Sequence, residues 1–349
     1  IDHMLGVNQY PQLKHILKIT SDSSGRVASP NHVNDPAEYF ESHTHRVLTT
    51  PFYTAYLKIG EGCSNQCAFC IIPKIRGRFR SRSQESVVTE ARHLARRGVK
   101  EFNLVSQDTT MYGIDLRVKN GLIHLLQSLA KIDGVEWLRL FYCYPTFINS
   151  DLIEYIASEE KVCNYIDVPL QHAHDVMLKR MKRQETEKEV RRMIEELRRK
   201  IPDVALRTTF ITGFPGETEI EFRHLLEFVR EIKFDHVGVF TYSHEEGTTA
   251  YDYPGLVSHE IAVERKDELM RVQQEICREK NKARVGEVLP VLVEGTDSEE
   301  EYLVTGRLTT QAPEIDGQVI IEASEVESGQ IVPMRITGST DYDLIACLA

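Results

Sequence analysis

The chain has 349 residues, of which 42 are Lys or Arg, 53 are Asp or Glu and 41% are hydrophobic. This composition is that of an ordinary folded protein and excludes a disordered or fibrous chain. The sequence has no apolar run of the roughly 18 to 20 residues that cross a membrane, no opening signal-peptide pattern, and seven Cys, too sparse a set for a secreted scaffold, so we expect a cytoplasmic protein that spans no membrane.

The first 50 residues show little regular pattern. The chain begins with Ile1 rather than Met, and residues 1–20 resemble the end of a preceding fold, so we expect the sequence to start inside a longer gene product. Residues 21–50 are rich in Ser, Asn, His and Pro, which is typical of a linker.

From residue 51 to residue 284, six β-rich runs alternate with stretches of helical periodicity. The predicted strands are Tyr53–Ile59, Glu101–Ser106, Trp137–Tyr142, Tyr165–Val168, Ala205–Thr212 and His236–Tyr242. The predicted helices are Ser83–Arg97, Gly121–Ile132, Ser150–Ser158, Thr186–Lys200, Thr218–Ile232 and His259–Arg284. The alternation predicts a parallel sheet of the α/β class, either doubly wound or curved into a barrel.

Polar residues capable of chemistry follow the carboxyl end of every predicted strand, as on the active face of a (β/α) barrel. A doubly wound sheet would gather its ligand loops at one switch point instead. Six units rather than eight predict a partial, TIM-like (β/α)6 barrel over residues 51–284, with an open side that suits a bulky substrate.

Residues 285–349 differ from the rest in charge and in pattern. They contain 13 acidic and two basic residues, a net charge of −11 that equals the charge of the whole chain. Gly, Pro and acidic turns separate five short runs, which predicts a small antiparallel β-barrel. The runs are Leu289–Val293, Tyr302–Thr305, Gln318–Ile321, Ile331–Ile336 and Asp343–Cys347. An acidic barrel, with Glu299, Glu300 and Glu301 adjacent, is expected to attract a basic protein and to repel nucleic acid.

The sharpest motif is Cys63-Ser-Asn-Gln-Cys67-Ala-Phe-Cys70, directly after the first predicted strand. Three thiolates in one loop suit an iron–sulfur cluster with one iron left open, since cubane clusters otherwise take four. Structural zinc favours four ligands in two separated pairs, and no second pair of suitable spacing is present. A disulfide would leave an odd thiol, and the other four Cys are isolated.

This motif resembles that of the radical S-adenosylmethionine (SAM) enzymes, in which an aromatic residue such as Phe69 often precedes the last Cys. The resemblance implies a [4Fe–4S] cluster on Cys63, Cys67 and Cys70, with SAM bound to the open iron. One electron from the cluster would cleave SAM to methionine and a 5′-deoxyadenosyl radical.

The resemblance also implies SAM contacts in the loops after strands two, four and five. These are Gln107 and Asp108 for the amino group, Gln171 and His172 near the ribose, and Gly213, Gly216 and Glu217 beside the adenine. Taken singly, the glycine segment reads as a tight turn and His172 as a packed polar residue. Arg207 is expected either to reach the SAM carboxylate or to form a structural salt bridge.

Two basic segments have alternative interpretations. Lys74–Arg82 carries five cations in nine residues and is either a solvated loop or a loop that holds the cluster–SAM assembly or an acidic substrate group. Lys179–Lys200 is interpreted as a solvated face, because glutamates offset its charge.

Longer motifs resemble the methylthiotransferase subgroup over essentially the whole chain. They include Tyr56–Cys63, Cys70–Pro73 and Arg207–Thr218. The segments Ser106–Gly113 and Asp167–His172 resemble the RimO-type branch, and the C-terminal barrel is similar to a TRAM domain. The tRNA-modifying MiaB branch typically has Gln-Asn where this chain has Gln107-Asp108.

The RimO-type resemblance implies attachment of a methylthio group to the β-carbon of an aspartate in the small-subunit ribosomal protein S-twelve. It implies a reductant such as flavodoxin or ferredoxin, and a second cluster on an N-terminal domain that carries the sulfur. Residues 1–20 resemble only the end of that domain, so an N-terminally truncated chain is expected. Two alternatives are a MiaB-like tRNA methylthiotransferase and a non-catalytic iron–sulfur module that binds RNA.

Overall fold

The computed structural model describes residues 4–6, 13, 31–32, 46–296, 304–322 and 325–349. The expected N-terminal remnant (1–20) and linker (21–50) lie mostly outside the described residues, as do Glu299, Glu300 and Glu301. The described part of the first 50 residues includes a short parallel pair, β1 (Met4–Leu5) with β2 (Asn31–His32).

Six parallel strands form one open sheet in the order β10-β9-β8-β7-β6-β3. They are β3 (Thr54–Lys58), β6 (Glu101–Val105), β7 (Trp137–Leu140), β8 (Val162–Asp167), β9 (Ala205–Thr212) and β10 (His236–Thr241). Strand order follows the chain from one edge to the other, and β3 does not pair with β10. The predicted partial (β/α)6 barrel is confirmed.

Helices connect successive strands, as the periodicity predicts. The six expected helices are α3 (Gln84–Ala95), α4 (Gly121–Ala130), α5 (Ser150–Ser158), α7 (Glu187–Lys200), α8 (Glu219–Ile232) and α9 (His259–Ala283). Thr186 and Thr218 each form a capping box, with Glu189 and Glu221 respectively, which fixes where α7 and α8 begin. Two short helices, α2 (Ile72–Arg76) and α6 (Asp175–Arg180), and a hairpin of β4 (Gly60–Glu61) with β5 (Arg80–Ser81) were not predicted.

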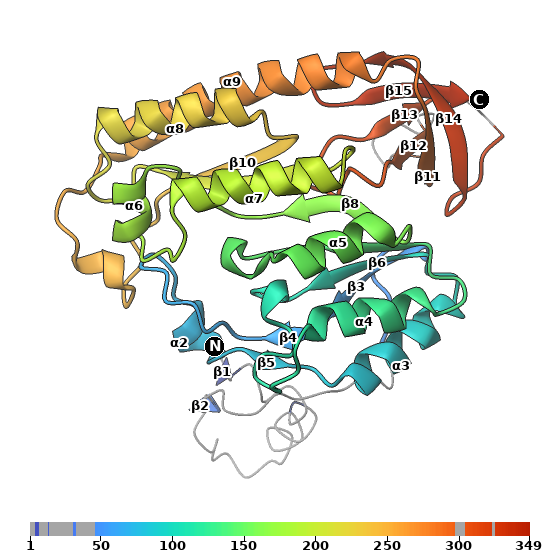
Figure 1. Ribbon diagram of the computed structural model, residues 1–349, viewed down its shortest axis with the longest axis horizontal. Coiled ribbons are helices and arrows are strands. Elements are labelled where there is room, and N and C mark those ends of the chain that lie inside the picture. The colour runs from blue at the N-terminus through green and yellow to red at the C-terminus, as the bar shows by residue number, and fades with distance from the viewer. Residues whose placement is uncertain (1–3, 7–12, 14–30, 33–45, 297–303, 323–324) are drawn as a thin grey trace, which may run out of the picture.

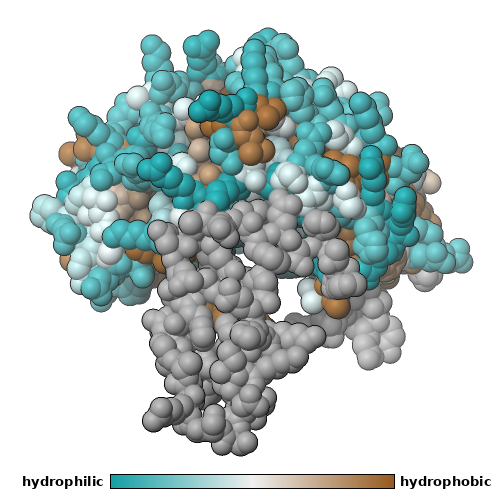
Figure 2. All heavy atoms as spheres, turned by 90° about the horizontal axis from the view of Figure 1, so that it is seen from below, coloured by the Kyte–Doolittle hydropathy of each residue, from teal (hydrophilic) through white to brown (hydrophobic). Residues whose placement is uncertain are grey.

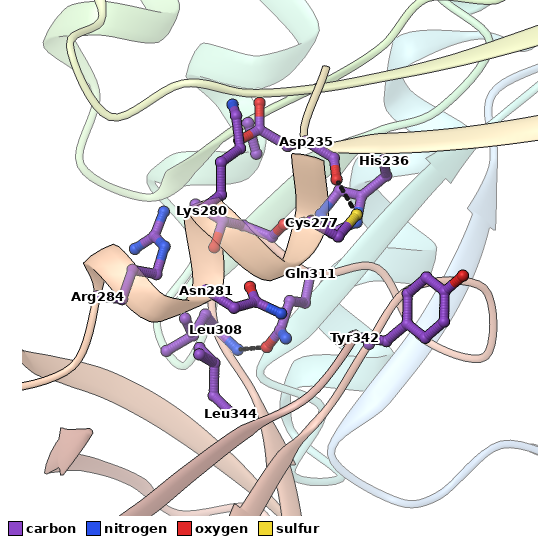
Figure 3. A pocket seen from close by; sticks show the side chains of 13 residues that line it. Asp235, His236, Cys277, Lys280, Asn281, Arg284, Leu308, Gln311, Tyr342 and Leu344 are labelled. Carbon is purple, nitrogen blue, oxygen red and sulfur yellow. Dashed lines mark hydrogen bonds and ion pairs between the residues drawn. The ribbon is translucent and has the colours of Figure 1, made fainter. Parts of the chain in front are cut away.

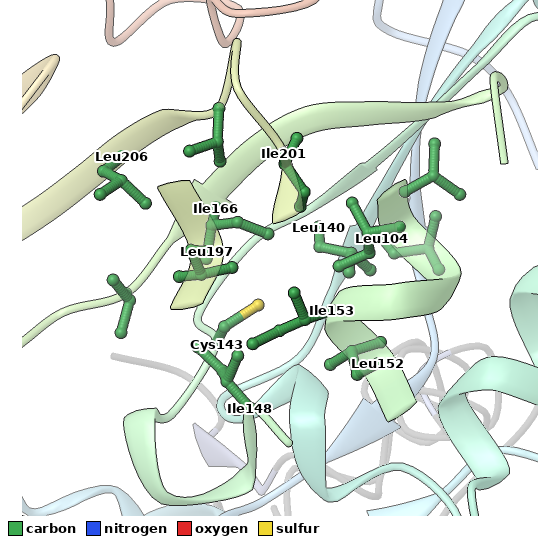
Figure 4. Packing of buried hydrophobic residues seen from close by; sticks show 14 of the residues in the cluster. Leu104, Leu140, Cys143, Ile148, Leu152, Ile153, Ile166, Leu197, Ile201 and Leu206 are labelled. Carbon is green, nitrogen blue, oxygen red and sulfur yellow. The ribbon is translucent and has the colours of Figure 1, made fainter. Parts of the chain in front are cut away.

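The main core lies between the sheet and its helices. Leu140 of β7, Ile153 of α5 and Leu197 of α7 point toward one another in this layer (Figure 4). Because apolar residues at helical spacing meet alternate residues of the strands, the other strand face is left free to line the barrel interior. None of the described helices has the length and hydropathy of a membrane span, and most described residues visible in Figure 2 are hydrophilic.

The C-terminal strands close into a barrel in the order β11-β12-β13-β15-β14. They are β11 (Val288–Thr296), β12 (Val304–Arg307), β13 (Val319–Ile321), β14 (Ile331–Ser339) and β15 (Leu344–Leu348). The barrel is confirmed, but the expectation of a wholly antiparallel one was wrong, because β13 and β15 pair in parallel. A closed ring of five strands cannot alternate in direction throughout, so one neighbouring pair must be parallel.

This small barrel covers the amino ends of the sheet strands (Figure 1). Arg307 of β12 reaches Glu101, the first residue of β6, at 2.6 Å between Nη2 and Oε2. The ring of His236, the first residue of β10, lies 2.9 Å from the Thr310 carbonyl oxygen. A small groove along this contact is lined by residues such as Asp235, Cys277 and Tyr342 (Figure 3). It lies at the opposite ends of the strands from the cysteine motif.

Candidate active site

The cysteine motif forms a loop directly after the β4 segment at the carboxyl end of β3. Cys63, Cys67 and Cys70 are each half-buried and none forms a disulfide. The loop is held by backbone bonds: the N–H of Cys63 donates to Gly77 O at 3.1 Å and that of Ala68 to Met181 O at 2.9 Å. Gly62, at the start of the loop, has φ of 79°, and a Cβ there would lie 2.4 Å from Arg78 O. Only glycine fits at this position.

The three thiols form one electrostatic group. The pKa of the Cys63 thiol is raised to about 11, mainly by burial and in part by repulsion from Asp108, Cys67 and Cys70. Within the described residues, no three His, Cys, Asp or Glu side chains converge tightly enough to hold a single ion. A cluster is wider than one ion and takes thiolates that stand further apart, and its positive irons would offset this repulsion. The donor set therefore fits a [4Fe–4S] cluster.

Gln107 and Asp108, which follow β6, both contact the cysteine loop. Gln107 Oε1 accepts from the N–H of Gly62 at 2.7 Å, and Asp108 Oδ2 accepts from Asn65 Nδ2 at 2.8 Å. Thr110 donates to the second Asp108 oxygen at 2.6 Å. The structure thus places both predicted residues beside the cysteines, where they hold the loop. Asn65 is a partner that the motif contained but that sequence reasoning did not single out.

The glycine segment after β9 forms a tight turn beneath the loop. Gly213 and Gly216 have φ of 75° and 86°. Glu217 Oε2 accepts from the Gly213 N–H at 3.0 Å, and its other oxygen lies 2.8 Å from Arg265 Nη1. Burial raises the pKa of Glu217 to about 7, although Arg265 opposes the shift. Phe69 meets the buried Phe214 edge-on, with ring centroids 6.5 Å apart, which joins this turn to the cysteine loop.

His172 is buried and lies behind the same turn. Its Nδ1 accepts backbone N–H bonds from Ala173 and His174, and its Nε2 lies 4.0 Å from Glu217 Oε2. Burial lowers its pKa to about 3, so the ring is neutral at pH 7. Gln171 has φ of 70° and extends the β8–β9 pairing through backbone bonds to Thr209 and Ile211. Gln171 is partly exposed, whereas the buried His172 and Glu217 support the turn from within.

Arg207 occupies the barrel interior and makes structural ion pairs. Its Nη1 lies 2.9 Å from Asp167 Oδ1 and its Nε lies 3.6 Å from Asp316 Oδ1 of the C-terminal barrel. Asp167 also accepts from the N–H of Tyr142, whose φ is 65°. The salt-bridge interpretation of Arg207 therefore has direct support. Asp167 was part of a motif used for the resemblance but was not predicted as a site residue.

Each of the two basic segments contains an arginine with a buried side chain. In Lys74–Arg82, Arg76 pairs with Glu61 at 3.0 Å and the buried Arg82 pairs with Glu90. In Lys179–Lys200, the Arg183 side chain is 4% exposed and contacts the cysteine loop, so the interpretation of that segment as a solvated face was wrong there. Nothing in the sequence indicated that Arg183 is buried, because Glu185 follows two residues later and balances its charge in the local count. In the structure the same Glu185 forms an ion pair with Arg183.

Replacing Gly213 with Ala should destabilise the protein. The positive φ alone costs a residue with a side chain about 1 to 3 kcal/mol, and the new Cβ would lie 2.4 Å from Ala262 Cβ. Gly286→Ala is the matched control, because Gly286 has φ of 99° but no atom within 4 Å of its Cβ position. Urea unfolding should show the larger loss for Gly213→Ala; equal losses would mean that the close approach to Ala262 has no effect.

Comparison with known proteins adds two domain matches. The model of the Radical SAM superfamily matches residues 57–229, and that of the TRAM domain matches residues 285–348. Among solved structures, the radical S-adenosylmethionine methyltransferase TsrM from Kitasatospora setae superposes with a TM-score of 0.48 at 17% identity, over 57% of this chain and 41% of that one.

Curated relatives match over almost the whole chain. The ribosomal protein uS12 methylthiotransferase RimO of Geobacter sulfurreducens is 47% identical over 345 residues, which are 99% of this chain and 76% of that protein. The protein of the same name from Clostridium kluyveri is 47% identical over 347 residues, with the same two coverages.

Proposed function

Because the chain belongs to the family of ribosomal protein uS12 methylthiotransferases in the radical SAM superfamily, we propose that Cys63, Cys67 and Cys70 hold its [4Fe–4S] cluster beside bound SAM. The chain is a transferase that acts on uS12, the small-subunit protein S-twelve, with SAM and an iron–sulfur cluster as cofactors. The observation that carries the site assignment is the placement of three half-buried thiols in one loop at the carboxyl end of a partial barrel.

We also propose the modified atom, the electron donor, the cellular compartment and the domain bounds. The methylthio group goes to the β-carbon of an aspartate, the electron donor is a flavodoxin or ferredoxin, and the reaction takes place in the cytoplasm. Residues 51–284 form the radical SAM domain and residues 285–349 the TRAM-like domain, a division supported by the change from a parallel sheet to a closed barrel.

When bound, the cluster supplies the electron that cleaves SAM and so gives access to an unactivated carbon. The chain's own residues shape the site around the cysteine loop. Gln107 and Asp108 fix the cysteine loop. Gly213 and Gly216 form the tight turn after β9, which Glu217 holds through the Gly213 N–H. Phe69 and Phe214 pack against each other between the two segments.

Anaerobic reconstitution of the chain with iron and sulfide, followed by dithionite and SAM, should yield 5′-deoxyadenosine. A cluster-bearing RNA-binding module would hold iron but yield none. We expect no methylthio-aspartate on a uS12 peptide, because the family resemblance implies a second cluster as sulfur carrier and these 349 residues contain one three-cysteine group. Mass spectrometry of the peptide would contradict the two-cluster requirement if it detected the product.

We propose that the acidic C-terminal barrel recruits the basic uS12 and disfavours tRNA. Of the two cations in residues 285–349, Arg307 is buried against Glu101, so Arg335 is the exposed one among the described residues. Glu322, Glu325 and Glu327 are exposed on the same barrel. Phosphate binding depends on Lys and Arg, whereas an acidic surface steers a basic protein.

Converting Glu322, Glu325 and Glu327 to Gln should slow association with uS12 several-fold at low salt, and less at 0.15 M salt, where screening acts over about 8 Å. The matched control removes the same charge from the radical SAM domain, at the exposed Glu85, Glu136 and Glu160. Stopped-flow binding at two ionic strengths measures the rates. Equal effects of the two triple variants, or tighter binding of tRNA than of uS12 to the unmodified chain, would contradict the proposal.

A further inference from the structure

A buried arginine lies against one of the cluster-binding cysteines. The guanidinium Nη1 of Arg183 is 3.7 Å from Cys67 Sγ, within hydrogen-bond reach of a sulfur acceptor. The rest of the guanidinium is held in place: Nε lies 2.6 Å from Glu185 Oε1 and Nη2 donates to Pro169 O at 2.9 Å. Its Cζ lies over the Tyr144 ring, 4.1 Å from the centroid. These contacts hold the guanidinium group in place, with Nη1 directed at the Cys67 sulfur.

One backbone bond and one side-chain contact join the segment around Arg183 to the cysteine loop. The Ala68 N–H donates to Met181 O at 2.9 Å, two residues from Arg183, and Gln184 Nε2 lies 3.5 Å from Asn65 Oδ1. The side chains of Arg183 and Glu185 are 4% and 3% exposed. An ion pair this well buried is costly to desolvate, and replacing it with apolar residues would often stabilise a protein. Its location against Cys67 suggests a role beyond stability.

We propose that Arg183 is a positioning residue that holds the Cys67 thiolate and makes the cluster easier to reduce. Uptake of one electron from the reductant adds a negative charge and makes or breaks no bond. A nearby cation and an N–H donor to a ligand sulfur both favour the more negative, reduced form, since hydrogen bonds and net charge set cluster potentials. Glu185 partly offsets the positive charge of Arg183. The reduction potential of the cluster therefore lies between the value expected beside an unpaired arginine and the value expected with no cation nearby.

The test is an EPR-monitored redox titration of the reconstituted 349-residue chain. Arg183→Met should make reduction at least tenfold less favourable, a shift of 59 mV to more negative potential for a one-electron couple. Arg183→Lys keeps the charge but loses the planar fork and should shift less. Glu185→Gln removes the offsetting charge and should shift the potential in the opposite direction. Arg223→Met, on the exposed face of α8, is the control and should leave the potential unchanged.

Opposite shifts for Arg183→Met and Glu185→Gln cannot arise from general damage to the site. Unchanged potentials in both variants, or shifts in the same direction, would overturn the inference. If Arg183→Met binds no iron, Glu185→Gln decides alone, and a shift to more positive potential is required. The inference rests on the proposed cluster site, which the iron content and EPR signal of the unmodified chain test separately.

Discussion

Replacing Cys67 with Ala should abolish the broad visible absorption of the reconstituted protein and all formation of 5′-deoxyadenosine. The cluster would lose one of its three thiolate ligands, and the methyl group of Ala cannot bind iron. The same loss is expected for Cys63→Ala and Cys70→Ala. Iron content, the visible spectrum and chromatography of the SAM cleavage products give three independent measurements.

The control for this experiment is Cys347→Ala. Cys347 is partly exposed on β15, far along the chain from the loop, and it forms no disulfide. This variant should retain full iron content and full SAM cleavage. A Cys67→Ala protein with a full complement of iron would show that Cys67 is not a cluster ligand and would remove the basis of both the function and the role of Arg183.

Replacing Glu101 with Gln should destabilise the whole chain by about 3 to 5 kcal/mol, the usual cost of removing one partner from a buried ion pair. Glu101 is fully buried between two arginines, with 2.6 Å to Arg307 Nη2 and 3.1 Å to Arg139 Nη2. Its loss would leave Arg139 without this carboxylate and Arg307 with Glu294 alone, at the contact between the sheet and the C-terminal barrel. Glu136→Gln, one residue before β7 and exposed, is the control and should change the free energy of unfolding by less than about 0.5 kcal/mol.

The difference in the free energy of unfolding between the original chain and Glu101→Gln should become smaller as the pH falls. Burial alone would raise the pKa of Glu101, but Arg307 and Arg139 outweigh it and lower the pKa to about 2. Its unfolded value is about 4.3, so its contribution to stability is fully present above that pH and is lost as the pH falls toward 2. Denaturant unfolding at pH 7, 4 and 3 should show the difference between the original chain and Glu101→Gln narrowing. A constant difference over this range would contradict the ion-pair origin of the effect.

Much of the fold could be predicted because its signals are local. Alternating β-rich and helix-period segments located all six strands of the sheet and all six long helices, and Thr186 and Thr218 lie at the predicted starts of α7 and α8. The short helix α6 was missed because six residues give less than two turns of periodicity. The β4–β5 hairpin was missed because two-residue strands show no alternation.

The candidate site could be predicted in part. The cysteine spacing and the polar residues at strand ends are visible in the sequence, because parallel strands bring their carboxyl ends to one edge. Burial and partner choice are not visible there. Nothing local distinguishes His172 and Glu217, which are buried, from Gln171, which is partly exposed. The pairing of Arg207 with Asp316 joins residues 109 positions apart, and only the contact between the two domains creates it.

The C-terminal barrel supplies Arg307 and Asp316 to the interior of the larger one, so the two domains are not interchangeable parts. Grafting the corresponding barrel of another protein onto this sheet would leave Glu101 without Arg307 and Arg207 without Asp316. The Tyr165 hydroxyl, which donates to Asp316 at 2.7 Å, would lose its acceptor. A working chimera therefore requires the arginine and the aspartate to be transferred together with the barrel, or their partners in the sheet to be replaced by apolar residues. During evolution the same constraint would tie changes in the C-terminal domain to changes inside the radical SAM domain.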